Sequence, residues 1–325
     1  MRSVTHASFG NPAEVLTLTE VPQPQPGPEQ ILVRMTYSPI HNHDLWTIRG
    51  MYGHKPVLPG IGGSEAAGVI DALGSNVQHL KIGQRVVTAG VHGTWAEYFL
   101  ATATAAVPLP DEINDKVGCQ LIAMPVSALM LLEYLDIKPG QWMIQNAANG
   151  TVGKTVAMLA KSRGIHVINL VRRHGTIKEM AALGLRNTIS TDHPDWQEQI
   201  AALLDGKPLV RAVDSVGGKS SGDLLHLLSE GGVLVSFGAM SGQPMQISSG
   251  DMIFKQVTIK GFWASKVAST VPAQDKQRMI GELIHLAASG DLILPVDSLF
   301  DLSDAVQAVT ASERPGRQGK ILLRG

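Results

Sequence analysis

A glycine-rich turn in the middle of the chain constrains its fold more than any other segment. Residues 145–153 read Gln-Asn-Ala-Ala-Asn-Gly-Thr-Val-Gly and lie between an apolar run and a segment of helical period. Ala148, Gly150 and Gly153 occupy the three positions of the G-x-G-x-x-G pattern, with alanine replacing the first glycine. Small residues there permit a tight turn, a close approach of the backbone to a pyrophosphate, and close packing of helix on strand. Because a strand precedes the loop and a helix follows it, the segment predicts dinucleotide binding.

The loop belongs to a longer stretch in which two patterns alternate. From about Gln120 to Gly261, short apolar runs typical of strands alternate with segments of helical period. The expected strands cover residues 142–147, 166–171, 187–190, 211–214, 233–237 and 257–261, and the clearest expected helices cover 152–163, 178–183 and 222–229. This alternation predicts an α/β fold with a parallel sheet and crossover helices.

The remainder of the chain has a different texture. Up to about residue 118, short β-rich pieces at 31–35, 67–70 and 85–87 are separated by proline and glycine turns. After Gly261 we expect a helix over 273–288 and a last strand over 320–323. Since the parallel sheet is complete by Gly261, the tail is assigned to the first domain. The 325 residues then form a discontinuous β-rich domain, 1–118 with 264–325, and an inserted sheet domain, 119–263.

Composition excludes several classes of partner. The chain has 27 Lys and Arg against 28 Asp and Glu, a net charge of −1, so it lacks the basic excess that nucleic acid or an anionic membrane attracts. The apolar stretch 121–132 is shorter than the ~20 residues of a membrane span, and the first residues lack the apolar core of a secretory signal. We therefore expect a cytoplasmic protein. The single cysteine, Cys119, excludes an internal disulfide and zinc sites built from several thiolates.

Two arginines bear on which dinucleotide is bound. A fold that prefers NAD normally carries an acidic residue ~20 positions after the loop, where it holds the ribose 2′-hydroxyl. The residue 19 positions after Gly153 is instead Arg172, and Arg173 follows it. Guanidinium groups suit a 2′-phosphate because they offer planar, multidentate donors. The pair favours NADP(H) over NAD(H); the alternative is that both side chains only solvate a strand end.

Motifs along the whole chain resemble the medium-chain dehydrogenase/reductase superfamily, and within it the zinc-free enoyl reductases. They lie at residues 38–45, 49–53, 58–65, 93–98, 146–153, 168–173, 260–263 and 319–322. The block Gly-Met-Tyr-Gly, the loop Asn-Ala-Ala-Asn, the strand end Ile-Asn-Leu-Val-Arg and the triplet Gly-Phe-Trp resemble mitochondrial-type 2-enoyl thioester reductases in particular. The resemblance implies a GroES-like β-rich catalytic domain plus a Rossmann domain with a doubly wound parallel sheet. It also implies a homodimer formed through the Rossmann sheet edge, near 233–237 or 257–261.

The same resemblance implies that no zinc is bound. Zinc-dependent members of the superfamily use three catalytic ligands, and the corresponding positions here are His41, Ser64 and Ala123. A serine and an alanine cannot complete a catalytic site of three protein ligands, and the lobe of four cysteines is absent. His41 and His43 stand two residues apart, but no third ligand is apparent. We expect them to line or flank the substrate cleft, or to be satisfied locally.

The resemblance also implies roles for individual residues. Tyr52 corresponds to the tyrosine linked to protonation of the substrate α carbon; the alternative is a packing aromatic. The substrate pocket would include His41, Trp95, Met124 and Trp263, although either tryptophan could belong to the core. The cofactor would be bound by Asn146, Ala148, Asn149, Gly150, Thr151, Val152, Gly153, Arg172, Arg173, Phe237, Gly238, Phe262, Trp263 and Lys320. Glu65 is expected to be structural, holding the domain junction by hydrogen bonds.

Together these features predict an NADPH-dependent reductase of activated C=C bonds, with 2-enoyl thioesters as the first candidate among small-molecule substrates. Hydride would reach the β carbon and a proton the α carbon, while hydrogen-bond donors stabilise the enolate. A quinone or alkenal reductase with the same cofactor is the main alternative, and a non-catalytic NADPH-binding protein is a third. The chain departs from the enoyl reductase pattern at His41, Met124 and Ser127, which leaves the substrate open. Candidates for binding a coenzyme A phosphate are Arg49, Lys55 and Lys266.

Overall fold

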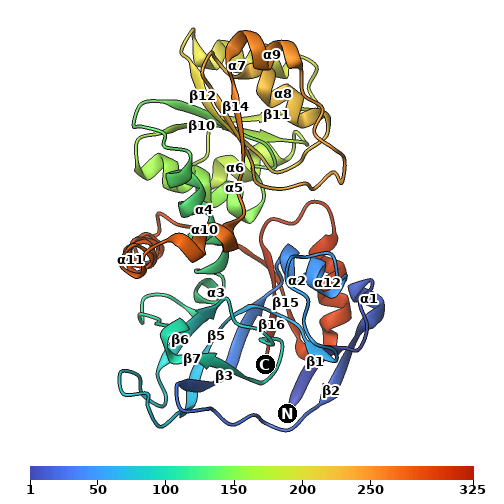
Figure 1. Ribbon diagram of the computed structural model, residues 1–325, viewed down its shortest axis with the longest axis vertical. Helices are drawn as coiled ribbons and strands as arrows, with labels where there is room; N and C mark the ends of the chain where they lie inside the picture. The colour runs from blue at the N-terminus through green and yellow to red at the C-terminus, as the bar shows by residue number, and fades with distance from the viewer. The chain divides into compact units, whose positions relative to one another are not determined.

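The computed structural model describes residues 1–325 and divides into two compact units (Figure 1). The first unit comprises Met1–Ala123 and Leu294–Gly325, and the second comprises Met124–Ile293. The first unit is therefore discontinuous, the second is inserted into it, and both chain ends lie in the first.

The boundary on the C-terminal side differs from the predicted one. The sequence assigned residues 264–293 to the first unit, whereas they group with the second. Helix α11 (Ala273–Ser289) buries Leu283, and its Arg278 donates to Glu133, another residue of the second unit, at 2.9 Å. Helical periodicity predicts that such a segment has an apolar stripe. It does not show which of the two units the stripe packs against.

Six parallel strands form the sheet of the second unit, in the order β11-β10-β9-β12-β13-β14. The strands are β9 (Trp142–Gln145), β10 (His166–Val171), β11 (Thr188–Ser190), β12 (Leu209–Asp214), β13 (Val233–Ser236) and β14 (Thr258–Gly261). Counted along the chain, the order is 3-2-1-4-5-6, that of the doubly wound dinucleotide-binding fold. The order reverses between β9 and β12. Ligands of such sheets lie outside the carboxyl ends of the strands at this point, which is where the glycine-rich loop leaves β9.

Helices cover both faces of this sheet. Helices α5 (Thr151–Ser162) and α6 (Thr176–Ala182) lie on one side, and α8 (Lys219–Leu227) and α9 (Ser249–Lys255) on the other (Figure 1). The remaining helices are α4 (Ala123–Tyr134), α7 (Trp196–Leu204) and α10 (Ala264–Thr270). No helix combines the length and the apolar character needed to cross a bilayer.

Every strand and helix predicted for this part of the chain is present, with ends displaced by a few residues. The strand expected over 142–147, for example, stops at Gln145. Ala147 has a φ of +48°, in the left-handed region, and therefore belongs to the turn. The strand periodicity continues past this point in the sequence, but the backbone conformation does not.

The first unit consists mainly of antiparallel sheet. A seven-stranded sheet runs in the order β15-β16-β3-β5-β6-β8, with β7 pairing β3, and a three-stranded sheet runs β2-β1-β4. The strands are β1 (Arg2–His6), β2 (Leu16–Glu20), β3 (Gln30–Pro39), β4 (Gly60–Ile61), β5 (Glu65–Leu73), β6 (Arg85–Ala89), β7 (Tyr98–Thr102), β8 (Ala106–Pro108), β15 (Val296–Asp301) and β16 (Lys320–Arg324). The helices are α1 (Pro12–Val15), α2 (Asn42–Ile48), α3 (Asp115–Gly118) and α12 (Ala305–Glu313). The last strand, β16, pairs with β3, so the end of the chain is built into this sheet.

Gly153 determines how closely α5 approaches the turn before it. A Cβ atom on Gly153 would lie 2.7 Å from both the Cα and the carbonyl oxygen of Ala148, closer than side chains approach a backbone. Gln145 also donates its side-chain amide to the carbonyl of Gly153 at 2.8 Å. The last small position of the loop is therefore needed for packing of the helix on the turn.

We expect Gly153→Ala to lower the free energy of unfolding by ~2 kcal/mol, because the added methyl group overlaps the backbone of Ala148. Gly281→Ala is the matched control, since a Cβ there meets nothing within 4 Å and alanine should add up to ~1 kcal/mol of helix propensity in α11. Urea unfolding followed by circular dichroism measures both. Equal stability of the two variants would contradict the close packing at Gly153.

Candidate active site

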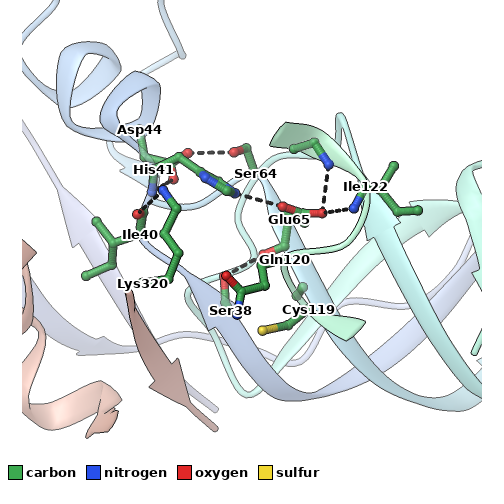
Figure 2. Close-up of polar contacts among 12 residues, drawn as sticks. Ser38, Ile40, His41, Asp44, Ser64, Glu65, Cys119, Gln120, Ile122 and Lys320 are labelled. Atoms are coloured by element: carbon green, nitrogen blue, oxygen red, sulfur yellow. Dashed lines mark hydrogen bonds and ion pairs between the residues drawn. The ribbon is translucent and has the colours of Figure 1, made fainter. Parts of the chain in front are cut away.

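A buried glutamate joins three segments of the first unit (Figure 2). Glu65 is the first residue of β5, and its side chain is fully buried. Its Oε2 lies 2.8 Å from Nε2 of His41, and its Oε1 accepts the backbone N–H groups of Ile122 and Ala123, each at 2.8 Å. Both carboxyl oxygens thus have partners, as burial of this group requires. Glu65 ties β5 to the residue that precedes α2 and to the segment that leads into α4.

Burial shifts the pKa values in this cluster. It raises the pKa of Glu65 to about 8, although the two backbone hydrogen bonds and the nearby Lys320 act in the opposite direction. Burial, followed by Lys320 and His43, holds the pKa of His41 well below its usual range. Burial also lowers the pKa of Lys320 to about 8, and its Nζ donates to the carbonyl of Ile40 at 3.1 Å. The ring of His41 is therefore neutral at neutral pH. A single proton lies in the hydrogen bond between its Nε2 and Oε2 of Glu65.

A second hydrogen-bonded chain lies beside the first. Nε2 of His43 lies 2.7 Å from Oγ of Ser64, and Ser64 donates its hydroxyl to Oδ1 of Asp44 at 2.6 Å. Oδ2 of Asp44 accepts the backbone N–H of His41 at 2.9 Å, as part of a capping box at the start of α2. The ring of His43 stacks on that of His41 at a centroid distance of 5.0 Å and lies 5.8 Å from the ring of Tyr52. The predicted proton donor, Tyr52, is thus the neighbour of a histidine with a defined hydrogen-bond partner.

The three positions that correspond to zinc ligands serve other contacts in this chain. His41 contacts Glu65, Ser64 donates to Asp44, and Ala123 offers only its backbone N–H, which Glu65 accepts. No three His, Cys, Asp or Glu side chains are grouped so that they could hold a metal ion. One histidine, one hydroxyl group and one methyl group do not fit a catalytic zinc site, which needs three protein ligands.

In the second unit, the glycine-rich loop forms the turn from β9 into α5. Gly150 is the N-cap residue of α5, and no side chain caps the helix. The first N–H groups of a helix have no intrahelical acceptor, so those of Thr151, Val152 and Gly153 are available to a ligand. The helix dipole favours an anion at this end. The loop therefore fits a pyrophosphate, with its backbone providing the contacts.

Asn146 supports this loop from within the protein. Its Nδ2 donates to Oδ1 of Asp214 at 2.6 Å and to Oγ of Ser220 at 2.8 Å, and its Oδ1 accepts the backbone N–H of Ser215 at 2.7 Å. Both amide hydrogens are used, and the bonds join the ends of β9 and β12 where the strand order reverses. The side chain of Asn146, a residue predicted to bind the cofactor, thus positions the loop.

The other residues predicted for the cofactor in this unit gather at the carboxyl ends of the strands. They are Asn149 in the loop, Arg172 and Arg173 after β10, Phe237 and Gly238 after β13, and Phe262 and Trp263 after β14. Arg172 and Arg173 are exposed, and neither side chain has a polar partner within the protein. The rings of Phe237 and Phe262 are neighbours, with centroids 5.9 Å apart, and Trp263 is 51% exposed. A dinucleotide site requires its residues at this edge of the sheet.

Two predicted site residues are buried in the first unit. Trp95, expected in the substrate pocket, has no exposed surface and belongs to the hydrophobic core of the first unit. It packs so tightly against Gly62 and Gly63 that a Cβ on either glycine would lie 2.3 Å from its ring. Lys320, expected at the cofactor, is buried in the first unit beside Ile40. A sequence motif aligns a residue with a position of the family. It does not show whether the side chain lines a cleft or is buried in the core.

Sequence reasoning missed Asp44 altogether and assigned His43 no partner. The available signal was the spacing of a capping box, since Asp44 is the third residue after the N-cap His41. Met124 is half-buried at the start of the part of α4 that lies in the second unit. Arg49, a candidate for a coenzyme A phosphate, is paired with Glu313 at 2.6 Å.

Replacing Glu65 tests the buried cluster. Glu65→Ala leaves the ring of His41 and two backbone N–H groups without partners, and we expect the free energy of unfolding to fall by ~3 kcal/mol or more. Glu65→Gln keeps an acceptor for the two N–H groups and a donor for Nε2 of His41, so it should lose less than half as much. Urea unfolding at about pH 7 compares them. Equal losses would mean that Glu65 supplies volume and not hydrogen bonds.

The raised pKa of Glu65 also gives this comparison a pH dependence. Between the usual carboxyl value of 4.5 and about 8, the folded state keeps a proton that the unfolded state has released. This group therefore makes stability fall as pH rises, by up to ~1.4 kcal/mol per pH unit. Glu65→Gln removes that contribution, so its stability should fall less than that of the wild type over this interval. A steeper fall in the variant would contradict the shift.

Comparison with known proteins matches a different family model to each of the two units. The family described as alcohol dehydrogenase GroES-like domain matches residues 27–111, and the family described as zinc-binding dehydrogenase matches residues 151–281. The solved structure of Escherichia coli quinone oxidoreductase complexed with NADPH has a TM-score of 0.90 and 26% identity, with 100% of both chains covered. A putative NADPH:quinone reductase from Bacillus thuringiensis has a TM-score of 0.91 and 27% identity, covering 100% of this chain and 98% of that one.

Relatives of higher sequence identity carry a different name. The mitochondrial enoyl-acyl-carrier-protein reductase of Homo sapiens is 32% identical over 329 residues, covering 99% of this chain and 88% of the human protein. The enzyme of that name from Caenorhabditis elegans is 33% identical over 301 residues, covering 90% and 86%. The chain therefore belongs to the medium-chain dehydrogenase/reductase superfamily and, within it, to the oxidoreductase family of the enoyl-acyl-carrier-protein reductases.

Proposed function

We propose that this protein is an NADPH-dependent, zinc-independent reductase of C=C bonds conjugated to a carbonyl group, with 2-enoyl thioesters as substrates. The observation that carries the proposal is the set of proton-bearing groups in the first unit, where Tyr52 neighbours His43, and His43 contacts Ser64. A conjugated double bond accepts hydride at its β carbon because the negative charge moves to the carbonyl oxygen. Hydrogen-bond donors and a proton source then suffice for the reaction. The full-length similarity to enoyl-acyl-carrier-protein reductases supports the thioester as substrate.

In this proposal, the second unit binds the dinucleotide and the first unit supplies the proton. The N-terminus of α5 would hold the pyrophosphate, and Arg172 and Arg173 would hold the 2′-phosphate of the dinucleotide. When bound, the reduced dinucleotide supplies the hydride. Tyr52 would then donate its phenolic proton to the α carbon.

Steady-state oxidation of NADPH with crotonyl-CoA, an enal and a quinone tests the substrate class. We expect the highest kcat/KM with the thioester, no stoichiometric zinc in the purified protein, and no loss of activity with a chelator. The similarity to solved quinone reductase structures favours a quinone as the second candidate. A higher kcat/KM with the quinone would replace the thioester assignment, and restoration of lost activity by zinc would refute the zinc-free mechanism.

Arg172→Ala tests the coenzyme preference. A charge-assisted hydrogen bond contributes ~1.5–3 kcal/mol, so its loss should raise the dissociation constant for NADPH ~10–100-fold, with little change for NADH. Arg186→Ala is the matched control, because Arg186 is an exposed arginine of the same unit that precedes β11 and so lies toward the amino ends of the strands. Calorimetric titration measures both cofactors. An equal effect on NADPH and NADH would refute a contact with the 2′-phosphate.

We further propose a homodimer formed through β14. Of the two strands predicted near the sheet edge, β13 is paired on both sides, whereas β14 is the edge strand. Its free backbone groups can pair with a second chain, and Ile253 and Phe254 on α9 are 61% and 84% exposed. Phe254→Glu should therefore shift a dimer toward monomer in light scattering. A monomeric wild type would contradict the proposal.

The cytoplasmic location expected from the sequence stays a prediction. The two enoyl-acyl-carrier-protein reductases reported above are named as mitochondrial proteins, and fractionation of the source cells tests the compartment.

A further inference from the structure

We propose that His43 is the proton reservoir of the site: it takes up a proton at Nδ1 and restores the proton that Tyr52 gives to the substrate. The inference rests on the proposed function and adds to it a positioning residue, His43, whose state is set by Ser64 and Asp44. Two observations carry it: the direction of the hydrogen bonds and the proximity of Tyr52 to the ring.

The direction of the hydrogen bonds fixes the tautomer of His43. Ser64 has one hydroxyl proton, and it is donated to Oδ1 of Asp44 at 2.6 Å. Oγ of Ser64 lies 2.7 Å from Nε2 of His43 and has only lone pairs left to offer it. Nε2 must therefore carry the hydrogen and donate it to Oγ. In the neutral ring the basic atom is then Nδ1. This atom has no partner within the protein, and the side chain is 24% exposed. A proton can be gained or lost at Nδ1 without disturbing the bonds to Ser64 and Asp44.

Titratable side chains from several segments face the ring of His43. Oδ1 of Asp44 lies 3.5 Å from Nε2, and the carboxylate is almost fully buried, so its attraction is weakly screened. The ring of His41 stacks on the other side and is neutral, because burial holds its pKa well below the usual range. The other titratable side chains near this pair are Tyr52, His92 and the buried Lys320, whose charge acts on both His41 and Asp44. Burial first, and then His54 and His43, lowers the pKa of His92, which limits the positive charge beside His43.

The proton transfers balance over one turnover. The O–H bond of Tyr52 breaks as a C–H bond forms at the substrate α carbon, which leaves a phenolate. The Nδ1–H bond of the His43 imidazolium then breaks and the O–H bond of Tyr52 re-forms, directly or through one water, between rings 5.8 Å apart. Neutral His43 finally takes a proton from solvent. The net reduction uses the hydride from the dinucleotide and one proton from water.

Replacing His43 tests the reservoir. With crotonyl-CoA, His43→Ala should lower kcat ~100-fold and leave the KM for NADPH unchanged, because the proposal assigns His43 to the return of a proton and not to binding of the dinucleotide. Added imidazole should restore kcat in proportion to its concentration, which a merely structural role would not allow. His79→Ala is the matched control, since His79 is an exposed histidine of the same unit without polar contacts. A variant with wild-type kcat, or one that imidazole does not rescue, would overturn the proposal.

A double-mutant cycle tests the coupling to Tyr52. If His43 acts by returning a proton to Tyr52, then His43→Ala should have no further effect on kcat in a Tyr52→Phe background. A full ~100-fold loss in that background would show that His43 acts independently of Tyr52, and would refute the relay.

A measurement that needs no substrate separates this inference from the proposed function. In protein labelled with 15N-histidine, the His43 signals, assigned by their loss in His43→Ala, should report hydrogen on Nε2 and titration at Nδ1. Ser64→Ala should remove this tautomer preference. A neutral ring with hydrogen on Nδ1 would overturn the inference whatever the substrate. If the wild type reduces no thioester but shows the predicted tautomer, the proposed substrate fails while the assignment of His43 stands.

Discussion

The buried carboxyl group of Glu65 is the interaction on which the site in the first unit depends. It is fully enclosed, yet both of its oxygens are used, by the ring of His41 and by the N–H groups of Ile122 and Ala123. This contact fixes His41, whose backbone N–H donates a hydrogen bond to Asp44. Asp44 in turn accepts a hydrogen bond from the hydroxyl group of Ser64. The buried carboxyl group of Glu65 therefore positions two chains of hydrogen bonds. The first contains His41, and the second runs from Asp44 through Ser64 to the partly exposed ring of His43.

The zinc-independent reduction that we propose is consistent with this arrangement. The positions where those enzymes have ligands hold a histidine committed to Glu65, a serine committed to Asp44, and an alanine. The first unit thus has a chain of hydrogen-bonded groups beside Tyr52, and the second has a loop that fits a pyrophosphate and, after β10, two exposed arginines. Hydride from a bound dinucleotide and a proton from Tyr52 are together sufficient for reduction of a conjugated double bond.

Sequence patterns predicted the parallel sheet well, because each strand is a short apolar run bounded by turn residues and each helix has its own periodicity. The small residues of the loop likewise indicated a close approach of α5, which the contact of Gly153 with Ala148 explains. The grouping of 264–293 with the second unit and the burial of Trp95 could not be predicted from local patterns, because each depends on packing between distant segments. The chain His43–Ser64–Asp44 was missed for the same reason: Ser64 stands 20 residues from Asp44 in the sequence, and only the tertiary fold brings the two side chains together.

The fate of two hydrogen atoms tests the account most directly. With crotonyl-CoA and NADPH in deuterated water, mass spectrometry and NMR of the saturated product should find one solvent deuterium at the α carbon and none at the β carbon. With NADPH that carries deuterium at the transferred hydride position, in ordinary water, the deuterium should appear at the β carbon alone. Deuterium delivered from NADPH to the carbonyl carbon, or a thioester that is not reduced at all, would contradict hydride transfer to a conjugated double bond with Tyr52 as the proton donor.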